Sequence, residues 1–199
     1  MENKIYEVSD FFKGYAGGCF SSPEEWIQED IIPNLSKNIK YIVDFGCANG
    51  RNFSPFIEKG YECIGLDIHP ESTVNHSCTF RYYTYSIEDF IKNPNEVDIN
   101  WEKSLVMTHG TLMYCVDSAT QNLFIDTLKS KNCKNFLFHE YTSDIILKNG
   151  NLNERTRNNG LGWVNLNSEN LKLFSSPLGN KKNYRDAVND MHALIYLQK

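Results

Sequence analysis

The stretch KYIVDFGCANGRN, residues 40–52, determines the fold that we predict for this chain. Residues 40–45, KYIVDF, are mostly apolar and have the composition of a buried strand with an acid, Asp44, near its end. Gly46 then begins a turn of small residues that ends at Gly50. The segment behind it, RNFSPFIEKG (51–60), predicts a helix that ends at a glycine. A strand, a glycine-rich turn and a helix in this order are typical of the ligand-binding edge of an open α/β sheet.

Other apolar segments predict the rest of the sheet. The expected strands are YECIGLD (61–67), TFRYYTY (79–85), SLVMTH (104–109) and KNFLFHEY (134–141), with a helix over SATQNLFIDTLKS (118–130). Alternation of strands and helices favours a mostly parallel sheet with helices on both faces. The segment MHALIYLQK (191–199) predicts an antiparallel edge strand, and ENLKLFSS (169–176) its hairpin partner, which makes seven strands.

The 199 residues fit one domain, residues 1–199. We expect residues 1–38 to form an N-terminal helical cap segment, because PEEWIQEDIIP (23–33) has a proline, first-turn acids and apolar residues at helical spacing. Residues 148–168 are polar and rich in Asn and Gly, with no clear period. A loop of this length is typically a functional lid or disordered, so it is a candidate substrate loop.

Composition narrows the classes of partner. A net charge of −5 argues against a broad nucleic-acid face, which needs clustered Lys and Arg. The chain shows no apolar run of membrane-spanning length and no signal-peptide pattern, so we expect a soluble, cytoplasmic protein without a membrane partner. The six cysteines include no C-x-x-C pair and are expected to be free thiols. A small-molecule partner remains, and the oligomeric state is open.

The glycine turn and the acid before it indicate which ligand binds there. Gly46, Ala48 and Gly50 let the backbone approach a ligand closely. Asp44 would repel a dinucleotide pyrophosphate and attract a cation, and the glycine spacing differs from G-x-G-x-x-G. S-adenosylmethionine, with its sulfonium and ammonium groups, fits this site. The alternative is that Asp44 only caps the turn.

Polar and apolar residues at the next strand ends complete the predicted ligand site. Asp67, twenty-one residues after Gly46, can accept both ribose hydroxyls, and Ile68 can lie against the adenine. Ser86 and Ile87 follow the third strand and can meet the adenine edge. Taken singly, Asp67 could instead be a solvated strand end.

With these motifs in order, VDFGCANG, GLDIHP, YSIEDF and SLVMTHGTLMY, the chain resembles the class I S-adenosylmethionine-dependent methyltransferases over about residues 20–145. The resemblance implies a Rossmann-like sheet and S-adenosylmethionine as cofactor, with S-adenosylhomocysteine as product. It also implies a set of cofactor-binding residues, which are Asp44, Gly46, Ala48, Gly50, Asp67, Ile68, Ser86, Ile87 and His109. Ser86 departs from the family, where many members have Asp reading the adenine amino group.

Two histidines at strand ends are the candidate catalytic bases. His109 ends the fourth strand and His139 ends the fifth, where the methyl group would lie, although each could instead be a structural histidine. His109 is favoured because it matches the family's segment after strand four. A metal site made of both histidines and Glu140 is the less favoured alternative, so we predict no metal.

The acceptor is predicted to be a hydroxyl of a small metabolite. The family's amino-directed motif after strand four is replaced here by THGTLMY, so methylation of nucleic-acid bases is disfavoured. Tyr114, Glu140, Arg155 and Arg157 are the candidate substrate-binding residues, and the two arginines would favour an anionic, phosphorylated or sugar- or nucleotide-linked acceptor. Alternatives are an inactive S-adenosylmethionine-binding protein, an N-methyltransferase of a small molecule, or a nicotinamide-dependent oxidoreductase, which Asp44 disfavours.

Overall fold

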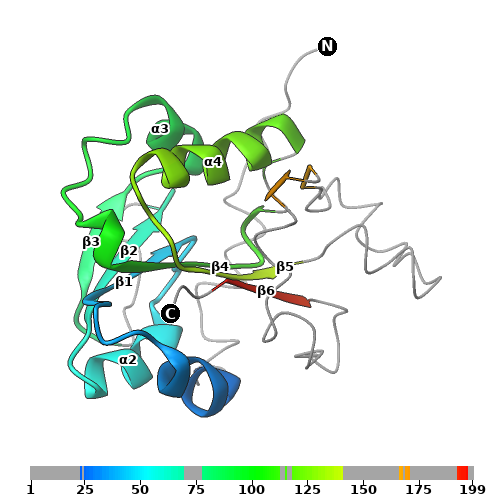
Figure 1. Cartoon of the computed structure of the whole chain (residues 1–199). Helices are drawn as coiled ribbons and strands as arrows, with labels where there is room; N and C mark the ends of the chain where they lie inside the picture. Colours follow the sequence, from blue (N-terminus) through cyan, green and yellow to red (C-terminus); the bar gives the residue numbers. More distant parts are fainter. Residues whose placement is uncertain are drawn as a thin grey trace, which may run out of the picture.

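The computed structural model describes residues 23, 25–69, 78–112, 115, 118–140, 166, 167, 169, 170 and 192–196, the last five as backbone only. Its centre is one sheet in the order β3-β2-β1-β4-β5-β6 (Figure 1). The strands are β1 (Tyr41–Phe45), β2 (Glu62–Asp67), β3 (Arg81–Thr84), β4 (Ser104–His109), β5 (Phe136–Glu140) and β6 (His192–Tyr196). The first five strands run parallel, and β6 pairs antiparallel with β5.

Helices cover both faces of this sheet (Figure 1). Helices α3 (Ile87–Lys92) and α4 (Ser118–Ser130) lie on one face, and α2 (Ser54–Glu58) lies on the other with the N-terminal turns. Those turns are a π-helical turn, Ile27–Ile31, and a 3-10 turn, Ile32–Asn34; two more 3-10 turns are Arg51–Phe53 and Trp101–Lys103. This is the layered α/β arrangement that the sequence predicts.

Alternating strand residues build a separate core on each face, because successive side chains point to opposite sides of a sheet. The core under α3 and α4 includes Val43, Phe45, Ile64, Leu66, Phe90, Val106, Phe124, Leu128, Phe136 and Phe138. The core under α2 includes Ile27, Ile31, Ile42, Phe53, Phe56, Cys63, Leu105, Met107 and Leu137. In the first core, Phe45 packs edge-on against Phe90 and Phe124, with ring centroids 5.1 and 4.8 Å apart. Full burial of such a ring stabilises the fold by about 1.5–3 kcal/mol.

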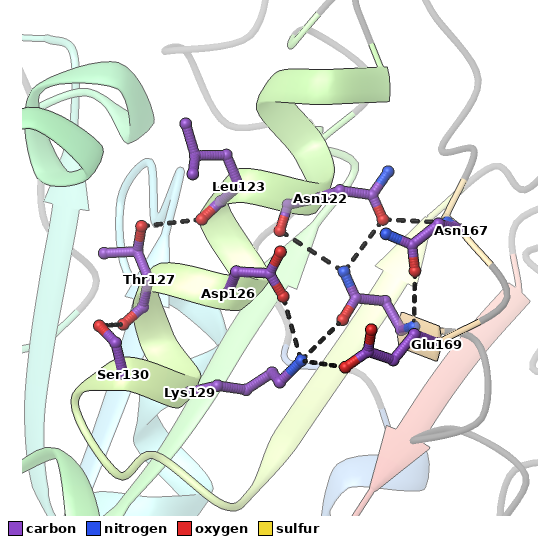
Figure 2. Close-up of polar contacts among 9 residues, drawn as sticks. Asn122, Leu123, Asp126, Thr127, Lys129, Ser130, Asn167 and Glu169 are labelled. Carbon is purple, nitrogen blue, oxygen red and sulfur yellow. Dashed lines mark hydrogen bonds and ion pairs between the residues drawn. The ribbon is translucent and has the colours of Figure 1, made fainter.

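A short segment, of which residues 166, 167, 169 and 170 are described, is attached to α4 by asparagine side chains (Figure 2). The Asn167 backbone N–H donates to Asn122 Oδ1 at 2.9 Å, and Asn170 Nδ2 donates to the same oxygen at 3.0 Å. Lys129 Nζ donates to Asn170 Oδ1 at 3.2 Å and lies 3.6 Å from Glu169 Oε1. Asn170 is fully buried, so these bonds satisfy an amide that has left water.

The structure confirms most predicted elements and corrects some of them. Helix 118–130 has the predicted bounds, whereas the predicted helix 51–60 is a 3-10 turn followed by five residues of α2, with Pro55 in its first turn. The sequence analysis did not predict α3, although Ser86 and Asp89 form a capping box at its start. Of the predicted strand 169–176 only residues 169 and 170 are described, so the seven-strand sheet stays a prediction.

Candidate functional site

The candidate site lies where strand order reverses, between β1 and its neighbour β4. In the order β3-β2-β1-β4-β5 the chain moves one way from β1 to β3 and the other way from β4 to β5. The carboxyl ends of these parallel strands meet at one edge, which is where open α/β sheets bind ligands. This edge therefore brings together the ends of β1, β2, β4 and β5, which carry most of the predicted site residues.

The turn after β1 needs residues that tolerate a left-handed backbone. Gly46, Ala48 and Gly50 have φ angles of 76°, 47° and 75°. Such angles suit glycine and are uncommon for alanine. The Gly46 N–H donates to the carbonyl of Leu66 on β2 at 2.7 Å, so the turn is closed against the neighbouring strand.

Two side chains fill the space that the missing Cβ atoms of the turn leave. A Cβ on Gly46 would overlap the side chain of Thr111, and a Cβ on Gly50 would lie 2.7 Å from Cζ of Phe80. The sequence analysis explained these glycines by a ligand's approach, and the structure adds packing by two side chains as a second reason. No sequence pattern indicated Thr111 or Phe80, because their contact with the turn is tertiary.

Replacing Gly50 with alanine should destabilise the fold more than the same change at Gly60. Both have a positive φ, 75° and 84°, but a Cβ on Gly60 would meet nothing within 4 Å. At either position, holding alanine in a left-handed backbone costs about 1–2 kcal/mol of folding free energy. At Gly50 the overlap of the new Cβ with Phe80 adds about 1–3 kcal/mol. Urea unfolding of Gly50→Ala and Gly60→Ala measures the difference, and equal losses would show that the ring moves aside freely.

Asp67, at the end of β2, holds the glycine turn in place. Its Oδ2 accepts the backbone N–H of Ala48 at 2.9 Å, and its Oδ1 accepts the N–H of His69 at 3.1 Å. The side chain is 7% exposed. A carboxylate oxygen has lone pairs for more than one hydrogen bond, so Asp67 can keep these two contacts and still accept the ribose hydroxyls as predicted.

Asp44 is a buried acid with an unsatisfied oxygen. It is 3% exposed, and within the described part of the chain its Oδ1 is buried and has no hydrogen-bond partner. Burial, followed by the nearby charge of Asp67, raises the pKa of the Asp44 carboxyl to about 7, while Arg51 lowers it and Glu140 raises it. A carboxyl in this state is stabilised in its ionised form by a cation, which agrees with the predicted ligand.

His109, which is half-buried, and His139, which is buried, form a pair at the ends of β4 and β5. Their Nδ1 atoms lie 3.2 Å apart, and Arg51 Nη2 lies 3.2 Å from His109 Nε2. Burial, then the charges of His139 and Arg51, hold the pKa of His109 well below its usual range. His109 is therefore a neutral imidazole near pH 7, the state that a general base requires.

The pair is covered from the N-terminal side by Trp26. Its ring meets the ring of His139 edge-on, with centroids 5.3 Å apart. A pocket with room for about one water molecule is lined by Trp26, Asn52, His109 and His139 among others. The sequence analysis did not include Trp26 and Asn52 among the site residues, because a half-buried tryptophan and a buried asparagine carry no motif.

Glu140 lies on the opposite side of β5 from His139 and supports the loop after β4. Glu140 is fully buried. Its Oε1 accepts hydrogen bonds from the backbone N–H groups of Thr111 and Leu112 at 2.9 and 3.1 Å. Neighbouring strand residues point to opposite faces, which separates Glu140 from the histidine pair. Across the described residues, no group of three His, Cys, Asp or Glu side chains could hold a metal ion.

The predicted adenine-binding residues follow the ends of β2 and β3. Ile68, just after β2, is 48% exposed, so its apolar side chain is accessible at this strand end. Ser86 Oγ accepts the N–H of Asp89 at 3.0 Å and donates to its carboxylate at 2.8 Å, so it caps α3. Ile87 is 6% exposed and belongs to the core under α3 and α4.

Several predicted residues lie outside the described part of the chain. They are Tyr114, Arg155 and Arg157, together with residues 148–165 of the candidate substrate loop and residues 1–22 of the cap segment. Their roles stay predictions.

None of the helices in the described residues is long and apolar enough to span a membrane.

Comparison with known proteins places the fold. No protein-family model and no curated protein matches the chain. The solved structure of the sugar N-methyltransferase KedS8 from Streptoalloteichus sp. is similar, with a TM-score of 0.52 and 14% identity over 72% of this chain and 58% of that one. S-adenosylmethionine-dependent methyltransferases from Methanosarcina mazei and Anabaena variabilis match with TM-scores of 0.43 and 0.47, at 16% and 15% identity.

These matches cover 60% of both this chain and the Methanosarcina protein, and 84% of this chain and 80% of the Anabaena protein. The chain thus spans less than two thirds of the length of KedS8 and of the Methanosarcina protein. The strand order and the similarity to KedS8 show the fold, which is that of the class I S-adenosylmethionine-dependent methyltransferases. At this level of identity the similarity shows the fold alone.

Proposed function

We propose that this protein is an S-adenosylmethionine-dependent methyltransferase that methylates a hydroxyl group of a small metabolite. The observation that carries the proposal is the pair of buried acids, Asp44 and Asp67, that flank a left-handed glycine turn at the point where strand order reverses. Two carboxylates at this place favour a ligand that offers a cation and hydroxyl groups over one that offers a pyrophosphate.

The chain's own residues would hold the cofactor in three parts. Asp44 would pair with the cationic amino-acid end, Asp67 would accept the ribose hydroxyls, and the exposed Ile68 would lie against the adenine, with Ser86 and Ile87 beside its edge. The glycine turn would let the backbone pass close to the ligand. When bound, this cofactor supplies an activated methyl group, so the protein's task is to align the acceptor and to remove its proton.

His109 is the proposed general base for a hydroxyl acceptor. It is neutral, it ends β4 at the candidate site, and His139 holds its ring through the Nδ1 contact. Glu140 would act on the acceptor indirectly, by positioning the loop that contains Thr111. Tyr114, Arg155 and Arg157 are proposed to contact the acceptor, and the two arginines would select an anionic group.

A second candidate is N-methylation of a small molecule. In this structure Nε2 of His109 faces the Arg51 guanidinium, which donates and cannot accept a proton. An amine that binds in its neutral form attacks with its own lone pair, and its proton can leave to solvent after methyl transfer, so it needs no base during that step. Substitution of His109 by glutamine separates the two: turnover of a hydroxyl acceptor should fall about 100-fold or more, whereas turnover of an amine should change little.

Calorimetric titration with S-adenosylhomocysteine tests the proposed function first, with NADH as the control ligand. We expect micromolar binding of the first and none of the second. Transfer of a labelled methyl group to hydroxylated, phosphorylated and amine metabolites then tests the reaction. Binding of NADH alone would favour an oxidoreductase, and binding of S-adenosylhomocysteine without any transfer would favour an inactive binding protein.

Affinity for S-adenosylhomocysteine should rise with pH around neutrality. The pKa of Asp44 is about 7 in the folded protein, so the carboxyl is mostly protonated at pH 6 and mostly ionised at pH 8. The ligand's ammonium group binds the ionised form, which predicts an increase of about tenfold over this range. Titrations at pH 6, 7 and 8 should show this slope in the parent and in Asp98→Asn, and lose it in Asp44→Asn. The same slope in Asp44→Asn would assign the effect to another group.

The raised pKa of Asp44 also predicts that the stability of the folded protein decreases with rising pH, whereas ligand affinity increases. Because the pKa of Asp44 in the folded state lies above its unfolded value of 3.8, the folded state binds more protons between about pH 4 and pH 7. Its contribution to the free energy of unfolding therefore falls as pH rises through this window. In Asp44→Asn this contribution should be absent.

A further inference from the structure

Arg51 connects the glycine turn on β1 with the end of β4. It follows Gly50 directly, and its backbone N–H donates to Asn49 Oδ1 at 3.2 Å, which holds the turn that starts the next helix. Its guanidinium reaches 58 residues along the chain to His109 Nε2, at 3.2 Å. The side chain therefore lies between the proposed cofactor site and the proposed base.

The guanidinium of Arg51 determines which ring nitrogen of His109 and of His139 carries the proton. A guanidinium has only donors, so Nε2 of His109 accepts and carries no proton. A neutral His109 then has its proton on Nδ1 and donates it to Nδ1 of His139 across 3.2 Å. His139 in turn must carry its own proton on Nε2. The lone pair with which His109 would act as a base is thus occupied by Arg51.

We propose that Arg51 is a positioning residue that occupies Nε2 of His109 until a carboxylate on the bound cofactor draws the guanidinium away. This inference depends on the proposed function, since it needs a ligand with an amino-acid group. Asp44 and Arg51 offer that group an acid for its ammonium and a guanidinium for its carboxylate. A carboxylate accepts two parallel bonds from a guanidinium, which are stronger than one bond to a neutral imidazole, so the exchange is favourable.

The exchange would make the base available only in the loaded protein. With Arg51 withdrawn, Nε2 of His109 faces the acceptor, and His139 keeps the ring oriented through Nδ1. The carboxylate would also offset the positive charge of Arg51, one of the causes that lower the pKa of His109. His109 would therefore become a stronger base when the cofactor is bound, and the cofactor would have to bind before the acceptor's proton is removed.

Nuclear magnetic resonance of the full chain labelled with ¹⁵N at histidine tests this directly, because long-range proton–nitrogen correlations show which ring nitrogen carries the proton. Spectra of His109→Gln and His139→Gln assign the two rings. In the free protein we expect His109 protonated on Nδ1. S-adenosylhomocysteine should shift the Nε2 resonance of His109, whereas 5′-methylthioadenosine, which lacks the amino-acid carboxylate, should leave it unchanged.

The variant Arg51→Met removes the guanidinium, and Arg81→Met is its matched control, since Arg81 pairs at 2.8 Å with the exposed Glu62 far from the pair. In Arg51→Met we expect mixed tautomers of His109 in the free protein and about tenfold weaker binding of S-adenosylhomocysteine. Its affinity for 5′-methylthioadenosine should not change. Arg81→Met should behave as the parent protein.

The outcomes separate this inference from the proposed function. Binding of S-adenosylhomocysteine without a change at Nε2 of His109, or a proton on Nε2 in the free protein, would overturn the role of Arg51 and leave the methyltransferase proposal standing. Equal effects of both ligands on Nε2 would also overturn it, because the carboxylate would then be irrelevant. Absence of binding in the parent protein would remove the proposed function, and this inference with it.

Discussion

Replacement of Asp67 with alanine should weaken the binding of S-adenosylhomocysteine by at least about 100-fold. The carboxylate accepts the backbone N–H groups of Ala48 and His69 and is proposed to accept the ribose hydroxyls as well. Each hydrogen bond to a charged group contributes about 1.5–3 kcal/mol, so loss of two ribose bonds alone exceeds a hundredfold change in affinity. Loosening of the glycine turn at Ala48 adds to this loss.

Asp67→Asn and Asp98→Ala are the matched variants for this prediction. Asparagine keeps one acceptor oxygen but places a donor against an N–H group, so its affinity should fall between those of the parent and of Asp67→Ala. Asp98 is exposed, and its replacement should leave affinity unchanged. Calorimetric titration gives the affinities, and circular dichroism checks that each variant is folded. Parent-like affinity in folded Asp67→Ala would remove this residue from the site.

Replacement of Glu140 with alanine should lower the free energy of unfolding by about 3–5 kcal/mol. The change would leave the N–H groups of Thr111 and Leu112 without the acceptor that Oε1 provides. An unsatisfied buried donor costs about 1–3 kcal/mol, and the lost side chain leaves a cavity as well. Because Thr111 also fills the space beside Gly46, affinity for S-adenosylhomocysteine should fall together with stability.

Two other glutamate variants separate the role of Oε1 from loss of charge or volume. Glu140→Gln keeps an acceptor oxygen and nearly the same shape, so its loss should be about 1–2 kcal/mol. Glu102 forms an exposed pair with Lys134 at 3.8 Å, and Glu102→Ala should cost under about 1 kcal/mol. Urea unfolding measures all three. A loss in Glu140→Ala no larger than in Glu102→Ala would mean that the loop finds other acceptors.

Residues of the candidate site differ in how far the sequence could predict them. Gly46 and Gly50 stand out in the sequence as a glycine turn after a strand, and the structure adds that both have a left-handed backbone, with φ angles of 76° and 75°. The exposed Ile68 and the buried Asp67 lie at the strand end where they were predicted. The alternation of side chains along a strand carries one more signal. His139 and Glu140 are neighbours on a strand, so their side chains point to opposite faces, and only one of them can lie on the same face as His109.

The pattern of apolar residues along the chain was sufficient to predict β1, β2, β4, β5 and α4, because strand and helix periods are local properties of sequence. Which groups bond across the site was decided only by the tertiary structure. The contacts of Asp67 with Ala48, Glu140 with Thr111 and Arg51 with His109 join residues 19, 29 and 58 positions apart. Such pairs form where parallel strands place their carboxyl ends side by side, and no local period records which side chains then meet.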